Sequence, residues 1–562
     1  FERGKIYDRN GNILATNEKI YTLVLEPKNI LLRKKKYEAT TINALHEYFG
    51  FSKKNLKKVI EGNKDSYYVV YKKNMTYDEV AKFQKFLDMA DDSTKGVSDA
   101  KKEKIESARQ VKGISFEEDY KRIYPYNSLA CRILGFTSSG NVGNWGIEQS
   151  YNEQLNGVNG RAYYYFNEEL DQEQTVKEAK NGNSVVSTID MQIQKIIEEK
   201  LNDFDSKIGS KVTNILVMNP QNGEILGMAS SNPYDLNEPM DEKKLLSLYS
   251  QSEIDEMKAY TQEKEAEEAS EEESGEESSE ETTEQEDKDT EKKKTIYDAF
   301  YELWRNAIIS DTNEPGSTYK PFTVAAGLEE GILKGNETFY CDGAETIAGH
   351  HISCIKKAGH GMETIQQALE NSCNDALMQM SYLIGPANFS RYQQIFNFGL
   401  KTNIDLPGEA RTDSLIYTED QLSTINLATN SFGQSYNVTM IQMITGYCSL
   451  INGGDYYEPH VVKQILNDQG SVVKEVKPKL VRETVSESTS SFIKDALFRT
   501  VSEGTGKAAA VEGYEIAGKT GTAEKIPRSA KNYLLSFCGF APAYDPQVLV
   551  YVTVDTPHVE DQ

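Results

Sequence analysis

The sequence predicts a mixed α/β (α+β) protein of two or more domains, one of which contains an antiparallel sheet flanked by helices. At 562 residues the chain is too long for a single hydrophobic core. Residues 214–218 and 224–229 are strand patterns separated by a Pro/Gly turn, which indicates a hairpin. The apolar runs 534–541 and 547–554 flank another turn and indicate two adjacent antiparallel strands. From Thr295 onward, helical patterns alternate with strands.

The N-terminal part of the chain, residues 1–205, has the pattern of a separate scaffold domain. Short strand-like runs such as 21–25 mix there with charged helical stretches such as 91–110. This half carries no obvious constellation of catalytic residues. The pattern changes near residue 212, so residues 206–562 are predicted to form the second domain.

Charge is distributed unevenly along the chain. The formal net charge is -25, which argues against nucleic acid as a partner because binding phosphates needs a basic surface. Sixteen acids and five lysines lie between Glu263 and Lys294, a balance of -11. Such a composition buries too little apolar surface to offset its ordering entropy, so about 241–294 is predicted to be a disordered insertion. A solvated loop and a partner-binding segment are both open interpretations.

The cysteines do not predict a disulfide-rich protein, and the hydropathy pattern does not predict a membrane-spanning segment within this sequence. Six cysteines in a chain of this length do not make a disulfide scaffold. No run of about 18 apolar residues is present that would span a bilayer.

The tetrapeptide Ser317-Thr318-Tyr319-Lys320 is a candidate nucleophile and base. Residues three apart share a face of a helix, so the lysine amine can reach the serine hydroxyl. A desolvated lysine can be neutral and accept the serine proton. The spacing alone is weak, because four more Ser-x-x-Lys tetrapeptides start at Ser98, Ser353, Ser471 and Ser491.

Two further motifs distinguish Ser317 from the other four serines. Ser372-Cys373-Asn374 follows an amphipathic stretch, and Lys519-Thr520-Gly521-Thr522 follows a strand pattern. Ser-x-x-Lys, a Ser-Asp-Asn-like motif and Lys-Thr-Gly are together the signature of penicillin-binding proteins and serine β-lactamases. The chain resembles a class B penicillin-binding protein.

Matches outside the three motifs extend the resemblance over nearly the whole chain. It implies a penicillin-binding/serine β-lactamase-like transpeptidase domain at 206–562, and an extended N-terminal α+β pedestal or dimerisation-like domain at 1–205. Ser435 stands where relatives often carry glycine after Ser-Phe-Gly-Gln. The matching segments are Arg3 to Gly11, Tyr124-Pro125, Leu134 to Phe136, Gly146 to Glu148, Ser431 to Gln434, and Asn452 to Gly454.

The resemblance implies a role for each motif residue in a peptidoglycan D,D-transpeptidase. Ser317 attacks the carbonyl between two terminal D-alanines of a stem peptide and forms an acyl-enzyme, with Lys320 as the base. Ser372 relays a proton to the leaving amine. Asn374 holds the substrate amide and Lys320. Transfer of the acyl group to an amine on a neighbouring stem completes the cross-link, and a β-lactam antibiotic acylates Ser317 in the same way.

The third motif is implied to bind the substrate's terminal carboxylate. Lys519 presents a fixed positive charge, Thr520 and Thr522 donate hydroxyl groups, and Gly521 belongs to the same strand. The backbone N–H groups of Ser317 and Thr522 form the oxyanion hole. The alternatives, taken residue by residue, are that Asn374 caps a helix and that Lys519 is a solvated charge at a strand edge.

Cys341, Cys354, His360 and Cys373 form a second candidate site. Their spacings are 13, 6 and 13 residues, and three thiols with one imidazole suit a structural, tetrahedral zinc ion. Cys373 is the middle residue of the Ser-x-Asn motif, so the metal would support a catalytic loop. A Cys341–Cys354 disulfide and unpaired buried thiols remain open. Alternative ligands to Cys341 are Asp342, His350 and His351, whereas three further cysteines occupy apolar runs and suit a core: Cys131, Cys448 and Cys538.

The family resemblance carries further expectations about location and partners. It implies a position on the extracytoplasmic face of the bacterial membrane, an anchoring helix before Phe1, and a SEDS-type glycosyltransferase partner. The Cys/His set and the opening motif favour an elongation or sporulation type. No organic cofactor is expected. The alternative functions are a serine β-lactamase and a non-enzymatic β-lactam sensor or scaffold.

Overall fold

The computed structural model describes residues 1–166, 172–274 and 293–559. It divides into two compact units, each of which gathers several stretches of the chain. The first contains 1–5, 15–125 and 156–183, and the second contains 6–14, 126–155 and 184–562. This interleaved division differs from the two contiguous stretches, 1–205 and 206–562, that the sequence suggested.

The first unit is built on the long strand β2 (Ile13–Leu25). This strand pairs antiparallel with β3 (Val69–Thr76) and β4 (Ile114–Ile123). Apolar residues of β2, such as Leu23, pack with those of the surrounding helices into one core. The other elements of this unit are α1 (Pro27–Ile30), α2 (Leu32–Lys35), α3 (Glu38–Phe49), α4 (Lys53–Gly62), α5 (Tyr77–Asp88), α6 (Asp99–Gln110), β7 (Arg161–Phe166) and β8 (Gln172–Lys177).

The second unit contains a five-stranded sheet in the order β11-β10-β24-β23-β22. Every neighbouring pair in it is antiparallel. The two predicted strand pairs are confirmed, because β10 pairs with β11 and β23 pairs with β24. The strands are β10 (Ser210–Met218), β11 (Ile225–Ser230), β22 (Ala517–Glu524), β23 (Tyr533–Ala541) and β24 (Val548–Pro557).

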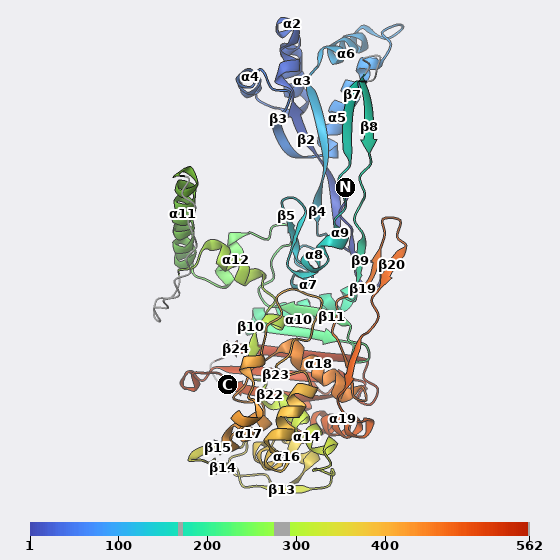
Figure 1. Cartoon of the computed structure of the whole chain (residues 1–562). Coiled ribbons are helices and arrows are strands. Elements are labelled where there is room, and N and C mark those ends of the chain that lie inside the picture. The colour runs from blue at the N-terminus through green and yellow to red at the C-terminus, as the bar shows by residue number, and fades with distance from the viewer. Residues whose placement is uncertain (167–171, 275–292, 560–562) are drawn as a thin grey trace. The chain divides into compact units, whose positions relative to one another are not determined.

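Helices cover both faces of this sheet (Figure 1). On one face, Ile197 of α10 (Met191–Lys207) packs against Ile215 and Val217 of β10. On the other face lies α18 (Met440–Ile451), a helix buried along its whole length. Because both faces are covered, strand residues on both sides of the sheet are buried, as all six residues of β11 are. The predicted antiparallel sheet flanked by helices is therefore confirmed.

Further helices beside the sheet carry two of the three motifs. They are α12 (Ile296–Trp304), α13 (Ala307–Ser310), α14 (Lys320–Glu329), α15 (Ile365–Glu370), α16 (Asn374–Ile395), α17 (Thr424–Ser431) and α19 (Glu487–Ser502). The remaining elements of the second unit are short: β1 (Ile6–Tyr7), α7 (Cys131–Leu134), β5 (Phe136–Ser138), β6 (Val142–Asn144), α8 (Gly146–Ser150), α9 (Asn152–Leu155), β9 (Ser184–Ser187), β12 (Thr312–Asn313), β17 (Val438–Thr439), β18 (Asp455–Tyr457), β19 (Val462–Leu466), β20 (Val472–Glu475) and β21 (Leu480–Glu483).

The predicted disordered insertion at 241–294 begins with ordered structure, which corrects that expectation for its first part. Residues Glu242–Ser247 form a 3-10 helix, and Gln251–Ser274 form the long helix α11. Ile254 and Met257 lie three residues apart on α11 and are buried, and the Ile296 N–H donates to the Thr261 hydroxyl at 2.9 Å. Glutamate and alanine favour a helix, and these apolar contacts hold its first half. Residues 275–292 of the predicted insertion lie outside the described part of the chain.

Within the described residues, no helix is both long enough and apolar enough to cross a bilayer.

Candidate active site and metal centre

Ser317 lies in a 3-10 turn, Gly316–Tyr319, that leads directly into α14. Gly316 has a positive φ of 58°, and a Cβ atom there would lie 2.9 Å from the Thr522 carbonyl oxygen of β22. The turn is therefore packed tightly against the strand that carries the third motif. The Gly316 N–H also donates to the Gly433 carbonyl at 2.8 Å, so the Ser-Phe-Gly-Gln segment also holds this turn in place. Ser317 itself is half-buried.

The Lys320 side chain is fully buried at the start of α14. Its amine donates to the Ser372 carbonyl at 2.6 Å, to the Ser372 hydroxyl at 3.1 Å and to Asn374 Oδ1 at 2.7 Å. Burial disfavours the charged form and lowers the pKa of Lys320 to about 8, although nearby thiols and Glu363 act in the opposite direction. A neutral amine is thus accessible near neutral pH, as a general base requires.

Ser372 lies in the connection between α15 and α16. Its N–H donates to the Leu369 carbonyl and the Cys373 N–H donates to the Ala368 carbonyl, which is the Schellman pattern of a helix C-terminus. Ser372 takes the left-handed position of that motif, with φ at 54°, where glycine is usual. This backbone conformation costs on the order of 1–2 kcal/mol. It places the Ser372 hydroxyl within hydrogen-bond distance of the Lys320 and Lys519 amines.

Asn374 is the first residue of α16 and is not its cap. The cap is Cys373, whose sulfur accepts from the Ala376 N–H at 3.4 Å. The Asn374 amide instead joins two elements, because Oδ1 accepts from Lys320 and Nδ2 donates to the Ser353 carbonyl at 3.2 Å. The helix-cap alternative is therefore wrong for this residue.

Lys519 is fully buried on β22, so it is not a solvated charge at a strand edge. Its amine donates to the Ser372 hydroxyl at 3.0 Å and to the Thr520 carbonyl at 3.1 Å. Burial, reinforced by the charge of Lys320, lowers the pKa of Lys519 well below its usual value. Lys519 was expected to carry a fixed positive charge. With its pKa lowered, it needs a neighbouring anion to stay protonated, and a substrate carboxylate is such an anion.

The rest of the third motif packs against the turn of Ser317. A Cβ atom at Gly521 would lie 2.4 Å from the Ser536 hydroxyl and 3.0 Å from the Thr318 methyl group, so only glycine fits. Thr520 is half-buried and Thr522 is exposed. The Thr520 and Thr505 hydroxyls lie 3.5 Å apart. Thr505 carried no sequence signal, because it lies in a Gly-Thr-Gly segment outside the three motifs.

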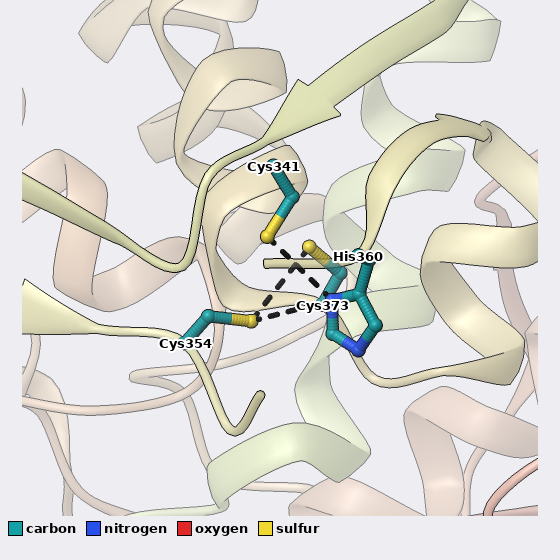
Figure 2. Close-up of side chains that lie close together, drawn as sticks. All are labelled: Cys341, Cys354, His360 and Cys373. Carbon is teal, nitrogen blue, oxygen red and sulfur yellow. Dashed lines mark hydrogen bonds between the residues drawn. The ribbon is translucent and has the colours of Figure 1, made fainter. Parts of the chain in front are cut away.

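The four predicted metal ligands converge on one point, and Figure 2 shows their side chains directed towards one another. Their ligand atoms all lie within 4.8 Å of one another. His360 Nδ1 lies 3.5 Å from Cys341 Sγ and 3.6 Å from Cys354 Sγ, and the Cys354 and Cys373 sulfurs are 3.8 Å apart. Sulfurs about 2.3 Å from a tetrahedral zinc ion lie about 3.8 Å from each other, so the donor set fits this metal.

The cluster is assembled from three pieces of local structure. Cys341 ends β13 (Thr338–Cys341), which pairs with β16 (Gly361–Thr364), and Cys354 follows a hairpin of β14 (Ala344–Ile347) and β15 (His350–Ser353). Cys373 comes from the start of α16. The hydrogen bond between Cys354 and Cys373 lowers the pKa of Cys354, which favours a thiolate there. His350 and His351 are exposed and, like Asp342, lie outside the cluster.

All six cysteines are free thiols in the structure. Cys131, Cys448 and Cys538 are buried, as their apolar surroundings predicted.

The metal cluster is connected to the site of Lys320 and Ser372 through residues next to its ligands. Cys373 separates Ser372 from Asn374, and the Ser353 carbonyl that holds Asn374 immediately precedes Cys354. A backbone acceptor such as Ser353 leaves no trace in a sequence.

The Ser-x-x-Lys tetrapeptides that start at Ser98 and Ser491 serve local structure. Ser98 caps α6 by accepting from the Lys101 N–H at 3.4 Å. Lys494 lies 3.7 Å from Glu487 on α19. Among the described residues, neither Ser98 nor Ser491 hydrogen-bonds to Lys320, Ser372 or Lys519, whereas the tetrapeptide of Ser317 contributes Lys320 to their site.

Comparison with known proteins agrees with this geometry. Residues 213–562 match the family model of the penicillin-binding protein transpeptidase domain, and residues 2–187 match that of the penicillin-binding protein dimerisation domain. Stage V sporulation protein D of Bacillus subtilis is 31% identical over 571 residues, covering 99% of this chain and 74% of that protein. The probable peptidoglycan D,D-transpeptidase PenA of Neisseria meningitidis is 25% identical over 570 residues, covering 99% of this chain and 80% of that protein.

Solved structures share the fold. Penicillin-binding protein 2X from Streptococcus thermophilus has a TM-score of 0.74 at 22% identity, covering all of this chain and 77% of that one. Penicillin-binding protein 3 of Mycobacterium tuberculosis, complexed with aztreonam, has a TM-score of 0.63 at 20% identity, covering 99% of this chain and 90% of that one. With both family models matched in order along the chain, this protein belongs to the class B penicillin-binding proteins, in which a dimerisation domain precedes a transpeptidase domain.

Proposed function

We propose that this protein works as a serine-type peptidoglycan D,D-transpeptidase through an acyl-enzyme at Ser317. Membership of the family supports this reaction, and one observation supports Ser317 as the nucleophile and Lys320 as its base. Lys320 lies one helical turn from Ser317, is fully buried, and is held by Ser372 and Asn374 with its pKa lowered to about 8. Such an amine is able to activate a hydroxyl at neutral pH.

The proposed acylation step moves one proton and replaces one bond. The Ser317 oxygen attacks the carbonyl carbon between the terminal D-alanines, and its proton passes to the neutral Lys320 amine. The developing oxyanion is stabilised by the N–H groups of Ser317 and Thr522, whose backbones approach closely through Gly316. Collapse of the intermediate breaks the amide bond and leaves an ester at Ser317.

Ser372 is the proposed path for the proton that the leaving group needs. Its hydroxyl lies 3.1 Å from the Lys320 amine and 3.0 Å from the Lys519 amine. A proton taken up by Lys320 can pass through this hydroxyl to the departing D-alanine amine. In the second half-reaction an amine of a neighbouring stem attacks the ester, and the same groups return the proton to Ser317.

A β-lactam is proposed to acylate Ser317 by the same attack. The solved relatives include penicillin-binding protein 3 of Mycobacterium tuberculosis complexed with aztreonam and with ampicillin. The test is intact-mass analysis after incubation with benzylpenicillin, followed by the rate of release. We expect one adduct on the wild type, none on Ser317→Ala, and slow release. Fast release would assign a β-lactamase, and no adduct on the wild type would leave a scaffold without the proposed chemistry.

We also propose that Cys341, Cys354, His360 and Cys373 hold a structural zinc ion. Three thiols and one imidazole at tetrahedral spacing support this, and the ion would neutralise charge that the buried thiolates otherwise carry. Metal analysis of the purified protein should find one zinc per chain and much less in Cys354→Ser. Cys448→Ser, a buried thiol outside the cluster, is the matched control. A zinc-free wild-type protein would exclude the metal site.

The cellular setting of the enzyme is proposed from its relatives and from the resemblance. The similarity to Stage V sporulation protein D favours a sporulation type over a division type. An N-terminal membrane anchor, a position on the extracytoplasmic face and a SEDS-type glycosyltransferase partner are further proposals. Co-purification of the full-length protein with such a glycosyltransferase from membranes tests the partner, and a protein recovered without it would contradict the pairing.

A further inference from the structure

The first unit carries a basic surface on a protein that is acidic as a whole. Residues 27–58 contain nine lysines and arginines and two glutamates, a balance of +7, whereas the whole chain has a formal net charge of -25. All nine cationic side chains are exposed. The basic surface is defined by these residues: Lys28, Arg33, Lys34, Lys35, Lys36, Lys53, Lys54, Lys57 and Lys58.

Helix α4 separates its apolar residues from its basic ones. Leu56 and Ile60 are buried in the core of the first unit. The four lysines of α4 are spaced three and four residues apart, so they share the exposed face of the helix. An ion pair of 2.7 Å between Lys35 and Glu61 joins α2 to α4. The two segments therefore form one surface at the same end of the first unit (Figure 1).

The segment α2 has a strained backbone. Arg33, Lys34 and Lys35 have positive φ values of 51°, 58° and 66°, a left-handed conformation that is unfavourable for residues with a side chain. None of the residues of α2 is buried, so the strain does not serve packing of the core. Backbone strain is concentrated at functional sites in proteins. This turn, which presents consecutive cations to solvent, is therefore a candidate binding element.

Most charges of the basic surface are not neutralised within the first unit. Among the described residues, Lys35 is the only one of the nine that forms an ion pair, with Glu38 at 3.8 Å and Glu61 at 2.7 Å. The Lys53 amine donates to the neutral Asn43 side chain at 2.7 Å. Eight exposed cations thus remain available to an anionic partner.

Two exposed apolar side chains accompany these cations. Leu32, at the start of α2, is 50% exposed, and Tyr67, in the loop after α4, is 56% exposed. The Lys28 N–H donates to the Ser66 carbonyl at 3.0 Å, and the Lys28 amine lies 4.5 Å from the centre of the Tyr67 ring. A soluble polyanion requires positive charge alone, whereas a bilayer surface also accepts apolar and aromatic side chains at the level of its headgroups.

We propose that the basic surface binds a bilayer that contains anionic phospholipids. The lysines and arginines contact the lipid phosphates, and Leu32 and Tyr67 enter the headgroup layer. The rest of the acidic chain is repelled by such a bilayer. Because both effects decay over about 10 Å at 0.1 M salt, the basic surface determines which end of the first unit faces the lipid.

This surface is separate from the N-terminal residues of the same unit. The Asn17 side chain donates to the Arg3 carbonyl at 2.6 Å, which places Arg3 beside β2. The strand continues from Asn17 to Leu25, a distance of about 26 Å at about 3.3 Å per residue, and α1 begins two residues later. A membrane anchor before Phe1 and the basic surface would therefore hold the first unit at two distinct points.

The experiment measures flotation of the 562-residue chain with phosphatidylcholine vesicles, with and without about one-third phosphatidylglycerol as the anionic lipid. We expect flotation only with the anionic vesicles, and release at about 1 M salt, where the screening length is about 3 Å. Flotation with neither vesicle, or equally with both, would overturn the inference. Salt-dependent self-association without flotation would assign the surface to a second, acidic copy of this chain instead.

The triple variant Lys54→Gln, Lys57→Gln and Lys58→Gln removes three charges from the exposed face of α4 without touching its buried face. We expect its partition coefficient for the anionic vesicles to fall by about tenfold or more. An unchanged partition coefficient would contradict the proposed surface.

A matched triple variant on α6 controls for net charge. Lys101→Gln, Lys102→Gln and Lys104→Gln remove three exposed charges from another helix of the first unit, outside the basic surface. We expect a partition coefficient within about twofold of the wild type, because attraction to the bilayer is local. An equal fall in both triple variants would show that net charge, and not this surface, governs binding.

Leu32→Ser distinguishes a bilayer from a soluble anion. We expect its partition coefficient to fall by roughly fivefold, because an apolar contact with the headgroup layer is lost. Leu246→Ser, at a leucine of similar exposure (52% against 50%) in the second unit, is the control and should bind as the wild type does. Unchanged binding of Leu32→Ser would overturn the bilayer assignment, and equally tight binding to inorganic polyphosphate would then point to a soluble phosphate polymer.

Discussion

At the residue scale, the hydroxyl of Ser372 accepts hydrogen bonds from both the Lys320 and the Lys519 amines, at 3.1 and 3.0 Å. Two buried ammonium groups this close repel each other, and burial opposes both charges. The pKa of each amine is therefore lowered. The ligand-free site favours a state with at least one neutral lysine, and a bound carboxylate would return the charge to Lys519.

The first prediction concerns pH. A lysine accepts a proton only when neutral, so acylation of Ser317 by benzylpenicillin should rise with pH through the Lys320 pKa of about 8 and level off above it. Stopped-time intact-mass measurements between pH 6 and pH 10 test this. A profile that stays flat across that range would contradict Lys320 as the base.

The same profile should move when the partner of Lys320 changes. Asn374→Asp places a carboxylate about 2.7 Å from the amine, where it stabilises the charged form and raises the Lys320 pKa. We expect the midpoint to shift upward and the rate at pH 7 to fall. Asn202→Asp, at an exposed position on α10 outside the site, is the control and should leave the midpoint unchanged.

At the element scale, two backbone segments clamp the turn that carries Ser317. The Gly433 carbonyl accepts from the Gly316 N–H at 2.8 Å, and the Thr522 carbonyl lies against Gly316 from the side of β22. These contacts tolerate no side chains. The Ser-Phe-Gly-Gln segment therefore contributes geometry to the nucleophile without contributing a catalytic group.

Gly433→Ala tests this clamp. Its Cβ atom would lie 2.1 Å from the Gly316 carbonyl oxygen, so the turn must shift, and penicillin acylation should fall by about tenfold or more. Gly470→Ala has a similar φ, 82° against 86°, with nothing within 4 Å of the new Cβ. It therefore shares the backbone strain and should keep the wild-type rate. Equal rates in the two variants would contradict the clamp.

At the scale of the whole molecule, the acidic insertion is separable from the catalytic machinery. Its ordered start, α11, is held by Ile254, Met257 and the bond from Ile296 to Thr261, all in the first half of the helix. Deleting residues 268–292 removes most of the local negative charge and spares these contacts. We expect penicillin acylation within about twofold of the wild type, because the contacts that hold the first half of α11 remain.

A contrasting variant identifies the part of α11 that matters for stability. Ile254 is 2% exposed, and Ile254→Asp would bury a charge without a partner. Its melting temperature should fall, while that of the deletion variant stays close to the wild type. A deletion that lowers the melting temperature as much would show that the acidic part stabilises the fold.

Much of the site was accessible from the sequence, because its parts are short motifs with fixed chemistry. The Ser-x-x-Lys spacing predicted a shared helical face, and the Cys/His spacing predicted the four residues that the structure brings together. The strand pairs at 214–229 and 534–554 followed from apolar runs around turns. Each of these predictions depends on neighbours in the chain or on residue type, which a sequence records directly.

Only the tertiary structure decided how separate segments act on one another. Two such contacts are the hydrogen bond from Lys519 to Ser372 and the hydrogen bond from Asn374 to the Ser353 carbonyl, and both join residues that are far apart in the chain. The helical start of the insertion also depended on apolar contacts with α12. The physical reason is that burial and proximity set pKa values and hydrogen bonds, and both exist only after distant segments have packed together.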